Sequence, residues 1–177
     1  MDINSDPKGI LLLTGTVGTG KTTVIAEIGD QLAATGLPNA VIDLDWLGWV
    51  NLGVHFHQYE RLIMQNLSST WQNYRAVGVD YLVLARGLLQ LEPVDMLKDA
   101  FPGTPVTIIR LLASEETIRR RLTQRDNGET LREHLNEMDR MNQIMDNLCL
   151  EDAIVVNDGL SVEEIAEQVI HIAGWKR

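Results

Sequence analysis

A glycine-rich segment between residues 15 and 22 carries the clearest chemical signal in the sequence. It matches the pattern G-x-x-x-x-G-K-[ST] at every fixed position. Glycines let the backbone wrap around a phosphate so that successive N–H groups point inward, and the N-terminus of a following helix adds positive charge. Lys21 is then placed to reach the outer phosphates of a nucleotide, and the Thr22 hydroxyl to ligate Mg²⁺. The residues predicted to bind the nucleotide here are Gly15, Thr16, Val17, Gly18, Thr19, Gly20, Lys21, Thr22 and Thr23.

Two aspartates, Asp43 and Asp45, follow the next apolar run of the chain. In open α/β sheets the carboxyl ends of strands face the ligand crevice, and side chains two apart in an extended chain point the same way. One carboxylate can then hold the hydration shell of a metal, while the other accepts the proton of an attacking hydroxyl. Away from a nucleotide site, two solvated loop acids would be the simpler interpretation.

Several arginines are also candidates. Arg121 and Arg125 are four residues apart, so they share one face of a predicted helix that leads into a polar break at residues 125–130. The alternative is a solvated basic face paired with nearby glutamates. Arg86 and Arg110 each follow an apolar strand run, where an unpaired charge is costly. We expect Arg86 either to bind an acceptor or to form an ion pair, and favour a structural ion pair for Arg110.

The elements that must position these residues alternate regularly along the chain. Buried strands are predicted at residues 9–14, 40–43, 81–85, from 106 and at 153–156. Helices are predicted at about 22–35 and 56–77, from Pro93, after a cap at Ser114, at about 131–148 and after a capping box at Ser161 and Glu164. Strands alternating with helices imply a parallel sheet wound on both faces, in one domain spanning residues 1–177.

Composition narrows the classes of partner. The net charge of −10 and the pI near 4.8 argue against nucleic acid, since phosphate contacts need clustered Lys and Arg. No run approaches the ~20 apolar residues of a membrane span, and no signal peptide opens the chain, so we expect a cytoplasmic protein without a membrane partner. The single cysteine, Cys149, excludes an intrachain disulfide and is expected to be a buried apolar residue. The oligomeric state, monomer or homodimer, stays open.

The glycine-rich loop followed by Asp43-Leu-Asp45 resembles the P-loop small-molecule kinases, which include shikimate, gluconate and adenylylsulfate kinases and chloramphenicol phosphotransferase. The resemblance implies an α/β P-loop NTPase fold, with a five-stranded parallel sheet in the order 2-3-1-4-5, helices on both faces and a short lid at about 125–132. It also implies transfer of the γ-phosphate of ATP, with Mg²⁺, to a hydroxyl of a small-molecule acceptor. Following the shikimate kinase pattern, Asp43 would lie near the metal and Asp45 would contact the acceptor. The arginines would close over the phosphates, and the turn holding Asp158 would flank the adenine.

Two departures from the resemblance matter. The third strand leads into Arg86-Gly87, where many P-loop proteins place a metal-binding aspartate. This disfavours a motor ATPase or GTPase and leaves Thr22 and Asp43 as the predicted metal ligands. The segment after Asp45 matches no substrate signature, so the acceptor is not named.

The resulting hypothesis has a catalytic set and an acceptor set. Lys21, Asp45, Arg121 and Arg125 are the predicted catalytic residues, and Asp45, Trp46, Trp49 and Arg86 the predicted acceptor site. The two tryptophans could wall a ring-shaped substrate or simply pack. A nucleotide kinase and a regulatory ATPase without an acceptor are the alternatives. A carboxylate at Asp45 discriminates against the regulatory ATPase, because only a transferase must manage an acceptor proton.

Overall fold

The computed structural model describes residues 6–51 and 56–175. Its centre is a five-stranded, all-parallel sheet in the order β2-β3-β1-β4-β5, which confirms the predicted topology. The strands are β1 (Gly9–Thr14), β2 (Asn39–Asp43), β3 (Tyr81–Ala85), β4 (Val106–Leu112) and β5 (Ala153–Val156).

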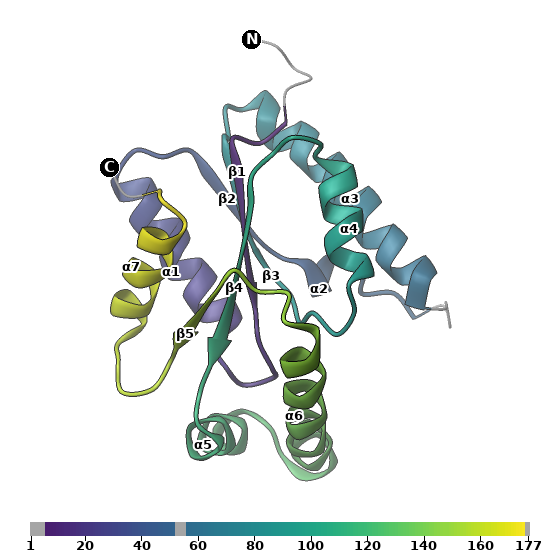
Figure 1. The fold of residues 1–177 in the computed structure, drawn as a ribbon, viewed down its shortest axis with the longest axis vertical. Coiled ribbons are helices and arrows are strands. Elements are labelled where there is room, and N and C mark those ends of the chain that lie inside the picture. Colours follow the sequence, from purple (N-terminus) through teal and green to yellow (C-terminus); the bar gives the residue numbers. More distant parts are fainter. Residues whose placement is uncertain (1–5, 52–55, 176–177) are drawn as a thin grey trace.

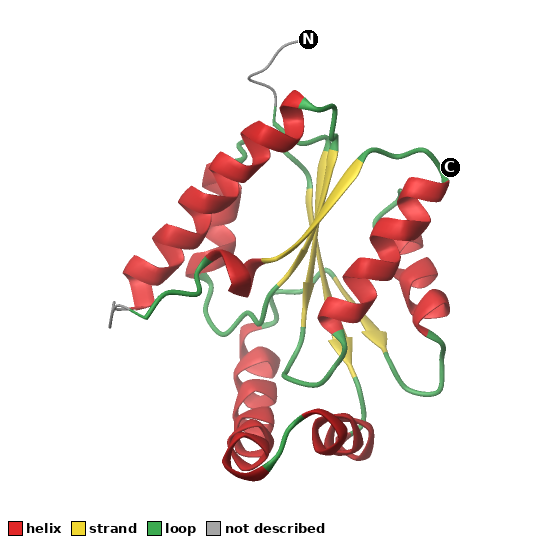
Figure 2. Ribbon diagram, turned by 180° about the vertical axis from the view of Figure 1, so that it is seen from behind, coloured by secondary structure: helices red, strands yellow, loops and turns green. Residues whose placement is uncertain are grey.

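Helices cover both faces of this sheet (Figures 1 and 2). One face carries α1 (Lys21–Ala34) and α7 (Val162–Ile172), and the other carries α3 (Phe56–Ala76) and α4 (Glu92–Ala100). A short helix, α2 (Leu44–Leu47), follows β2 directly. The remaining two, α5 (Glu115–Arg125) and α6 (Gly128–Leu148), extend beyond the carboxyl ends of the strands (Figure 1).

The strand β1 is buried on both faces, which requires a continuous run of apolar residues. Its residues alternate between the two faces, so Ile10 and Leu12 belong to the core under α3 and α4, and Leu11 and Leu13 to the core under α1 and α7. All four are at most 2% exposed. A strand buried on both faces is mostly apolar, and in β1 the single polar side chain, Thr14, is the last residue before Gly15 begins the loop.

The two predicted helix caps are confirmed. The Ser114 hydroxyl accepts a hydrogen bond from the Thr117 N–H at the start of α5. Ser161 and Glu164 form the capping box of α7. These side chains satisfy N–H groups that the first turn of a helix leaves without partners.

Four local predictions need correction. The helix α3 ends at Ala76, which leaves Val77 80% exposed. The strand β4 continues to Leu112, so Arg110 lies inside it rather than after it. The polar break covers only residues 126–127, because α6 begins at Gly128 and takes in most of the segment predicted as an irregular lid. Cys149 is exposed rather than buried, because it ends α6 in the left-handed conformation, with φ of 46°.

Arg110 forms the structural ion pair that the sequence favoured. It is 2% exposed, and its Nη1 lies 2.8 Å from Asp146 Oδ1 and 3.5 Å from Glu151 Oε1. These contacts join β4 to the end of α6 and to the segment that leads into β5.

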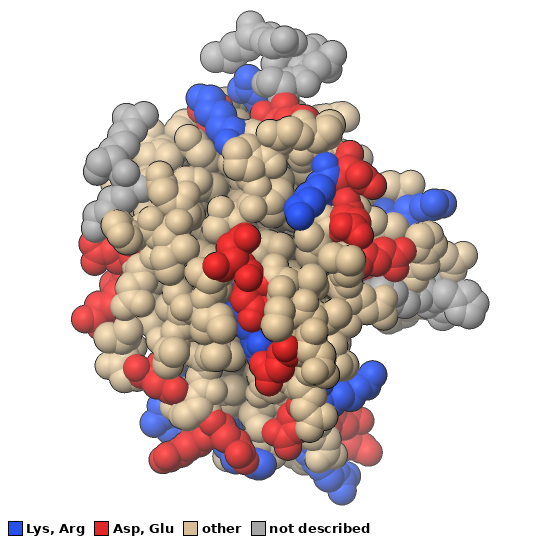
Figure 3. Space-filling view, in the orientation of Figure 1, with Lys and Arg blue, Asp and Glu red and all other residues tan. Residues whose placement is uncertain are grey.

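The surface agrees with an acidic chain. Acidic side chains are spread over the face in Figure 3, and among the residues described there no continuous basic surface is seen. No helix in residues 6–51 and 56–175 is long and apolar enough to cross a membrane.

The packing of α1 on β2 yields a first prediction. Gly29 is buried on α1, and a Cβ there would lie 2.4 Å from Val41 Cγ2. Gly29→Ala should therefore lower the free energy of unfolding by roughly 1–2 kcal/mol, because overpacking outweighs the better helix propensity of alanine. Urea unfolding measures this, with Asp30→Ala at the exposed neighbouring position as control. Equal stability of Gly29→Ala and wild type would show that β2 yields to the added methyl group.

Candidate active site

The glycine-rich loop between β1 and α1 has a backbone that demands glycine. Gly15, Gly18 and Gly20 have φ angles of 146°, 81° and 92°. A Cβ at Gly15 would lie 2.6 Å from the carbonyl oxygen of Leu111 on β4, and one at Gly18 would lie 2.9 Å from Ile118 Cγ2 on α5. The loop is therefore pressed between the sheet and α5, with a conformation that other residues do not readily adopt.

Lys21 lies across this loop. Its Nζ donates hydrogen bonds to the carbonyl oxygens of Gly15 and Thr16, both at 3.0 Å. An ammonium has three donors, so one stays available for a ligand. Burial lowers the pKa of Lys21, while the negative charges of Asp45 and Asp43 oppose that shift. The lysine is a positioned cation at the mouth of the loop.

Asn157, which follows β5, lies in the turn predicted to flank the adenine, but its side chain was not among the predicted site residues. It is 4% exposed, and its Nδ2 donates a 2.7 Å hydrogen bond to the Thr19 carbonyl oxygen in the loop. Arg121 Nη2 donates to the Asn157 backbone and side-chain oxygens, both at 3.3 Å, and Arg121 Nη1 donates to the Thr19 carbonyl oxygen at 3.3 Å. The loop, α5 and β5 are thus joined by one polar cluster. Its only signal in the sequence was an amide at the carboxyl end of a strand.

The side chains of Thr22, at the start of α1, and Asp43, at the end of β2, bring oxygen atoms together. The Thr22 hydroxyl donates to Asp43 Oδ2 at 2.7 Å, and Asp43 Oδ1 accepts from the Asp45 N–H at 3.2 Å. Mg²⁺ prefers oxygen and is usually held by one or two protein groups together with phosphates and water. This pair fits such an ion. Within the described residues no group of three or more His, Cys, Asp or Glu could hold a metal ion by itself.

A cavity of about 810 Å³ runs from the loop to the carboxyl ends of β2 and β3. This volume suits a ligand pocket. The predicted site residues that line it are Val17, Gly18, Gly20, Lys21, Thr22, Thr23, Asp43, Asp45, Arg86, Arg121 and Arg125. Gly15, Thr16 and Thr19 of the loop are not among the lining residues, and both threonines are buried. Lining residues that the sequence prediction did not name include Glu60, Gln124, Glu137, Met141 and Asn157.

Asp45 lies between the loop lysine and a buried ion pair, since it interacts electrostatically with Lys21 as well as with Arg86. The crowding of protein around its carboxyl raises the pKa of Asp45, while Arg86 lowers it. Arg86 Nη2 contacts Glu60 Oε1, and the guanidinium lies over the Tyr59 ring, 5.6 Å from its centroid. Burial also raises the pKa of Glu60, against the effect of Arg86. A raised pKa suits Asp45 to take up a proton.

Comparison with known proteins rests on structure. No family model matches the sequence, and no curated protein sequence matches it either. Solved structures do match. The tunicamycin resistance protein of Deinococcus radiodurans has a TM-score of 0.70 and 16% identity, covering 95% of this chain and 96% of its own. The adenylylsulfate kinase of Mycobacterium tuberculosis, solved with AMPPNP and adenylylsulfate, gives 0.65 and 17%, covering 95% and 98%.

A gluconokinase from Sinorhizobium meliloti matches with a TM-score of 0.61 and 18% identity, over 97% of this chain and 96% of that one. The chain has the fold of the small-molecule P-loop kinases. The predicted resemblance and fold class are thereby confirmed, while the activity and the acceptor are not decided at such identities.

Within this kinase fold, two predicted groups lie away from the cavity. Trp46 and Trp49 are 68% and 67% exposed and stack on each other, with centroids 4.9 Å apart, because α2 and its end direct them outward. Neither is among the described residues that line the cavity. Asp158 accepts hydrogen bonds from the Ser114 N–H and hydroxyl at 2.7 and 3.1 Å. Its carboxylate therefore holds the start of α5, and it too is absent from the lining.

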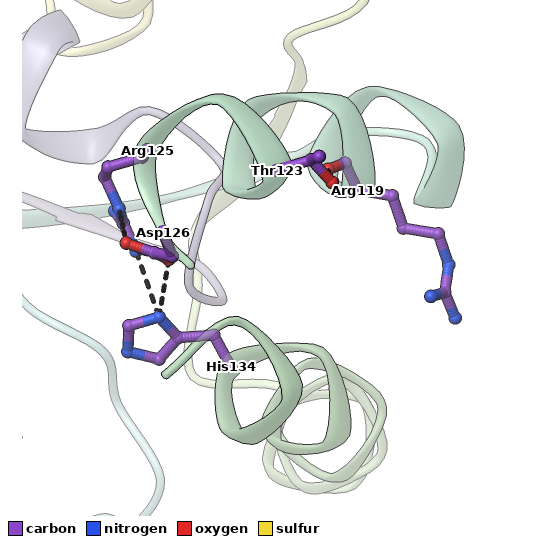
Figure 4. A network of polar contacts seen from close by, with 5 residues as sticks. All are labelled: Arg119, Thr123, Arg125, Asp126 and His134. Atoms are coloured by element: carbon purple, nitrogen blue, oxygen red, sulfur yellow. Dashed lines mark hydrogen bonds and ion pairs between the residues drawn. The ribbon is translucent and has the colours of Figure 1, made fainter. Parts of the chain in front are cut away.

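The predicted lid arginines differ in how they are held. Arg121 is fixed against the loop, and burial lowers its pKa. Arg125 is held by Asp126, with Nε to Oδ1 and Nη2 to Oδ2 both at 2.9 Å. His134 Nδ1 lies 2.7 Å from Asp126 Oδ2, so one carboxylate joins the end of α5 to α6 (Figure 4).

The Asp126 contacts yield a pH prediction. Hydrogen bonds from Arg125 and His134 lower the pKa of Asp126 from 3.8 to about 2. The stability that its carboxylate adds is complete above pH 3.8 and is lost as the pH falls through 2. Asp126→Asn should therefore melt below wild type at pH 7, with a deficit that shrinks between pH 4 and pH 2.

Melting curves by circular dichroism over this range provide the measurement. The control is Glu129→Gln, an exposed carboxylate whose contact with Arg132 is 4.0 Å long and should add little. A deficit for Asp126→Asn that is the same at every pH would show that the ionised carboxylate is not what joins α5 to α6.

Proposed function

We propose that the chain is an ATP-dependent kinase that transfers the γ-phosphate to a hydroxyl of a small-molecule acceptor. The observation that carries the proposal is that Asp45 lines the same cavity as Lys21 and the glycine-rich loop. A phosphate-binding loop alone fixes only the ligand class. A carboxylate of raised pKa across the cavity from it supplies what a transferase needs in addition, a group that accepts the acceptor's proton.

Each charged group at the loop end of the cavity has a role in this proposal. Lys21 and the loop amides bind the β- and γ-phosphates. Thr22 and Asp43 hold Mg²⁺, which neutralises phosphate charge when bound. Arg121, fixed against the loop, and Arg125 neutralise charge that develops on the transferring group. Asp45 orients the acceptor hydroxyl and takes its proton as the oxygen bonds to phosphorus.

The single domain with its lid belongs to the same proposal. The corner between α5 and α6, at about 125–132, is the lid, and it closes by releasing Arg125 from Asp126 toward the phosphates. The cytoplasm, where ATP is abundant, is the compartment in which such a kinase would act.

Nucleotide binding is the first requirement. With Mg²⁺-ATP at a hundred times Kd, the folded state should gain about 2.7 kcal/mol, seen as a raised melting temperature. Lys21→Ala should fold but lose most of this shift and abolish turnover, because it removes the cation that lies across the loop. Calorimetry and melting curves are the measurements. A Lys21→Ala protein that turns over ATP as wild type does would exclude the assigned site.

The role of Asp45 is tested by isosteric replacement. Asp45→Asn should leave ATP affinity nearly unchanged, since the loop holds the nucleotide, and should reduce acceptor-dependent turnover by roughly 10²–10⁴-fold. Steady-state transfer and calorimetric ATP affinity are measured together, after a metabolite screen has supplied an acceptor.

Asp43→Asn is the matched comparison, because this carboxylate lies on the same segment but contacts Thr22. Its loss should also weaken the dependence of turnover on Mg²⁺. If the chain is a regulatory ATPase, Asp45→Asn should leave turnover unchanged, and that result would reject Asp45 as the acceptor residue. It would leave the nucleotide site standing.

A further inference from the structure

The Glu60–Arg86 pair that lines the cavity has unused hydrogen-bonding capacity. Glu60 is 0% exposed and Arg86 6% exposed, and Nη2 of Arg86 contacts Oε1 of Glu60. The other oxygen, Glu60 Oε2, and the other terminal nitrogen, Arg86 Nη1, are buried without a hydrogen-bond partner. Buried polar atoms are rarely left unpaired, so an unpaired acceptor and an unpaired donor on two residues that line the cavity point to a ligand that reaches them through a small shift of these side chains.

The two atoms are of opposite kinds. Oε2 of an ionised carboxylate only accepts hydrogen bonds, and Nη1 of a guanidinium only donates them. A hydroxyl group does both, and two neighbouring hydroxyls can satisfy one atom each. A carboxylate or phosphate ester can satisfy only the donor and would place negative charge against Oε2.

The charge around the pair is negative. Glu60 neutralises Arg86, and Asp45 adds a second carboxylate close enough to affect the pKa values of both Glu60 and Tyr59. A third, Glu137, lines the cavity from α6. It lies four residues before Met141, whose Cε would be 3.0 Å from a Cβ on Gly87, the residue after Arg86. The helix face that bears Glu137 therefore faces this end of the cavity.

The cavity is thus divided by charge. The loop end presents Lys21, Arg121 and Arg125, which suit phosphates, whereas the other end presents Glu60 and Glu137 around one neutralised arginine, with Asp45 between the two ends. Glu60 is buried while the other two carboxylates are exposed, and a like charge placed beside this group is disfavoured.

We propose that the acceptor is a polyhydroxy compound without a carboxylate or phosphate group, and that the Glu60–Arg86 pair selects it through adjacent hydroxyls. Neutral sugars, nucleosides and amino sugars belong to this class, and an amine would be favoured by Asp45 and Glu137. That the bound compound accepts a phosphate rests on the proposed kinase function. The selection against anionic compounds depends on the binding site alone.

The site can be tested without a known acceptor. Sulfate is titrated by calorimetry into protein saturated with Mg²⁺-AMPPNP, which occupies the loop end. Wild type and the double variant Glu60→Gln/Arg86→Gln should bind sulfate equally. In wild type Glu60 neutralises the charge of Arg86, and in the double variant neither charge is present. Glu60→Gln alone frees the guanidinium and should bind sulfate at least about tenfold more tightly.

Wild type that binds sulfate several-fold more tightly than the double variant would overturn the proposal, because Arg86 would then be an anion ligand despite Glu60. A folded Glu60→Gln that gains no sulfate affinity would equally contradict the neutralising role of Glu60. Because Glu60→Gln leaves a buried charge without its partner, folding of each variant is checked by circular dichroism. The comparison of wild type with the double variant decides the question even if the single variant does not fold.

A second measurement uses matched acceptor pairs: glucose and glucuronate, sorbitol and gluconate, uridine and uridine monophosphate. ADP release and the mass of the product should identify the members without carboxylate or phosphate as the better acceptors in each active pair. An anionic compound with the highest kcat/KM would overturn the charge selection and leave the kinase function standing. ATP binding without stimulation by any hydroxyl compound would instead count against the kinase function, and the sulfate comparison would still decide the charge selection.

Discussion

The parallel register of the central strands fixes the geometry on which the site depends. Ala85 at the end of β3 is paired with Leu13 on β1 and with Asp43 on β2, so the three strands end at the same level. Arg86 then leaves the sheet between the glycine-rich loop and Asp43, held by a 3.0 Å hydrogen bond from its N–H to the Leu13 carbonyl oxygen. A slip of one residue in either pairing would turn these side chains to the opposite face. The apolar residues that lock the register therefore position the chemistry.

Two buried arginines illustrate how differently the same residue can be used. Arg110 pairs with Asp146, whose side chain is 67% exposed, near the end of α6, and neither is among the described residues that line the cavity. In the Glu60–Arg86 pair both side chains are buried, and both residues line the cavity. A buried ion pair is weak evidence for stability, because desolvation cancels much of its attraction, and an apolar pair of similar volume often serves as well. The position of the Glu60–Arg86 pair thus fits a binding role better than a structural one.

The predictions from sequence succeeded where the signal was local. The run from Ile10 to Leu13 and the spacing of the loop glycines each depend on a few neighbouring residues, and both the strand and the loop have the predicted bounds. Glu60 could not be found this way, because it lies in a polar stretch of a helix and meets its partner 26 residues later. The prediction that Cys149 is buried was wrong for a similar reason. The helical pattern does not show where α6 ends, and Cys149, which ends it in a left-handed conformation, is exposed.

The predicted lid, at the corner between α5 and α6, shows the same limit of prediction from local sequence. Polar residues around Gly128 suggested a break of several residues, but α6 begins there and α5 ends at Arg125. Ile118 and Leu122 of α5 form an apolar cluster with Met138 of α6, and Val17 of the loop packs against it. Because α5 contacts the loop directly, Arg121 is positioned against the loop by the fold itself, without any movement of the corner. Arg125 lies at the end of the helix, where its side chain is 54% exposed and contacts Asp126, which is 10% exposed. Because the guanidinium is already half in solvent, the closure that we propose can be a movement of the Arg125 side chain rather than a refolding of the corner.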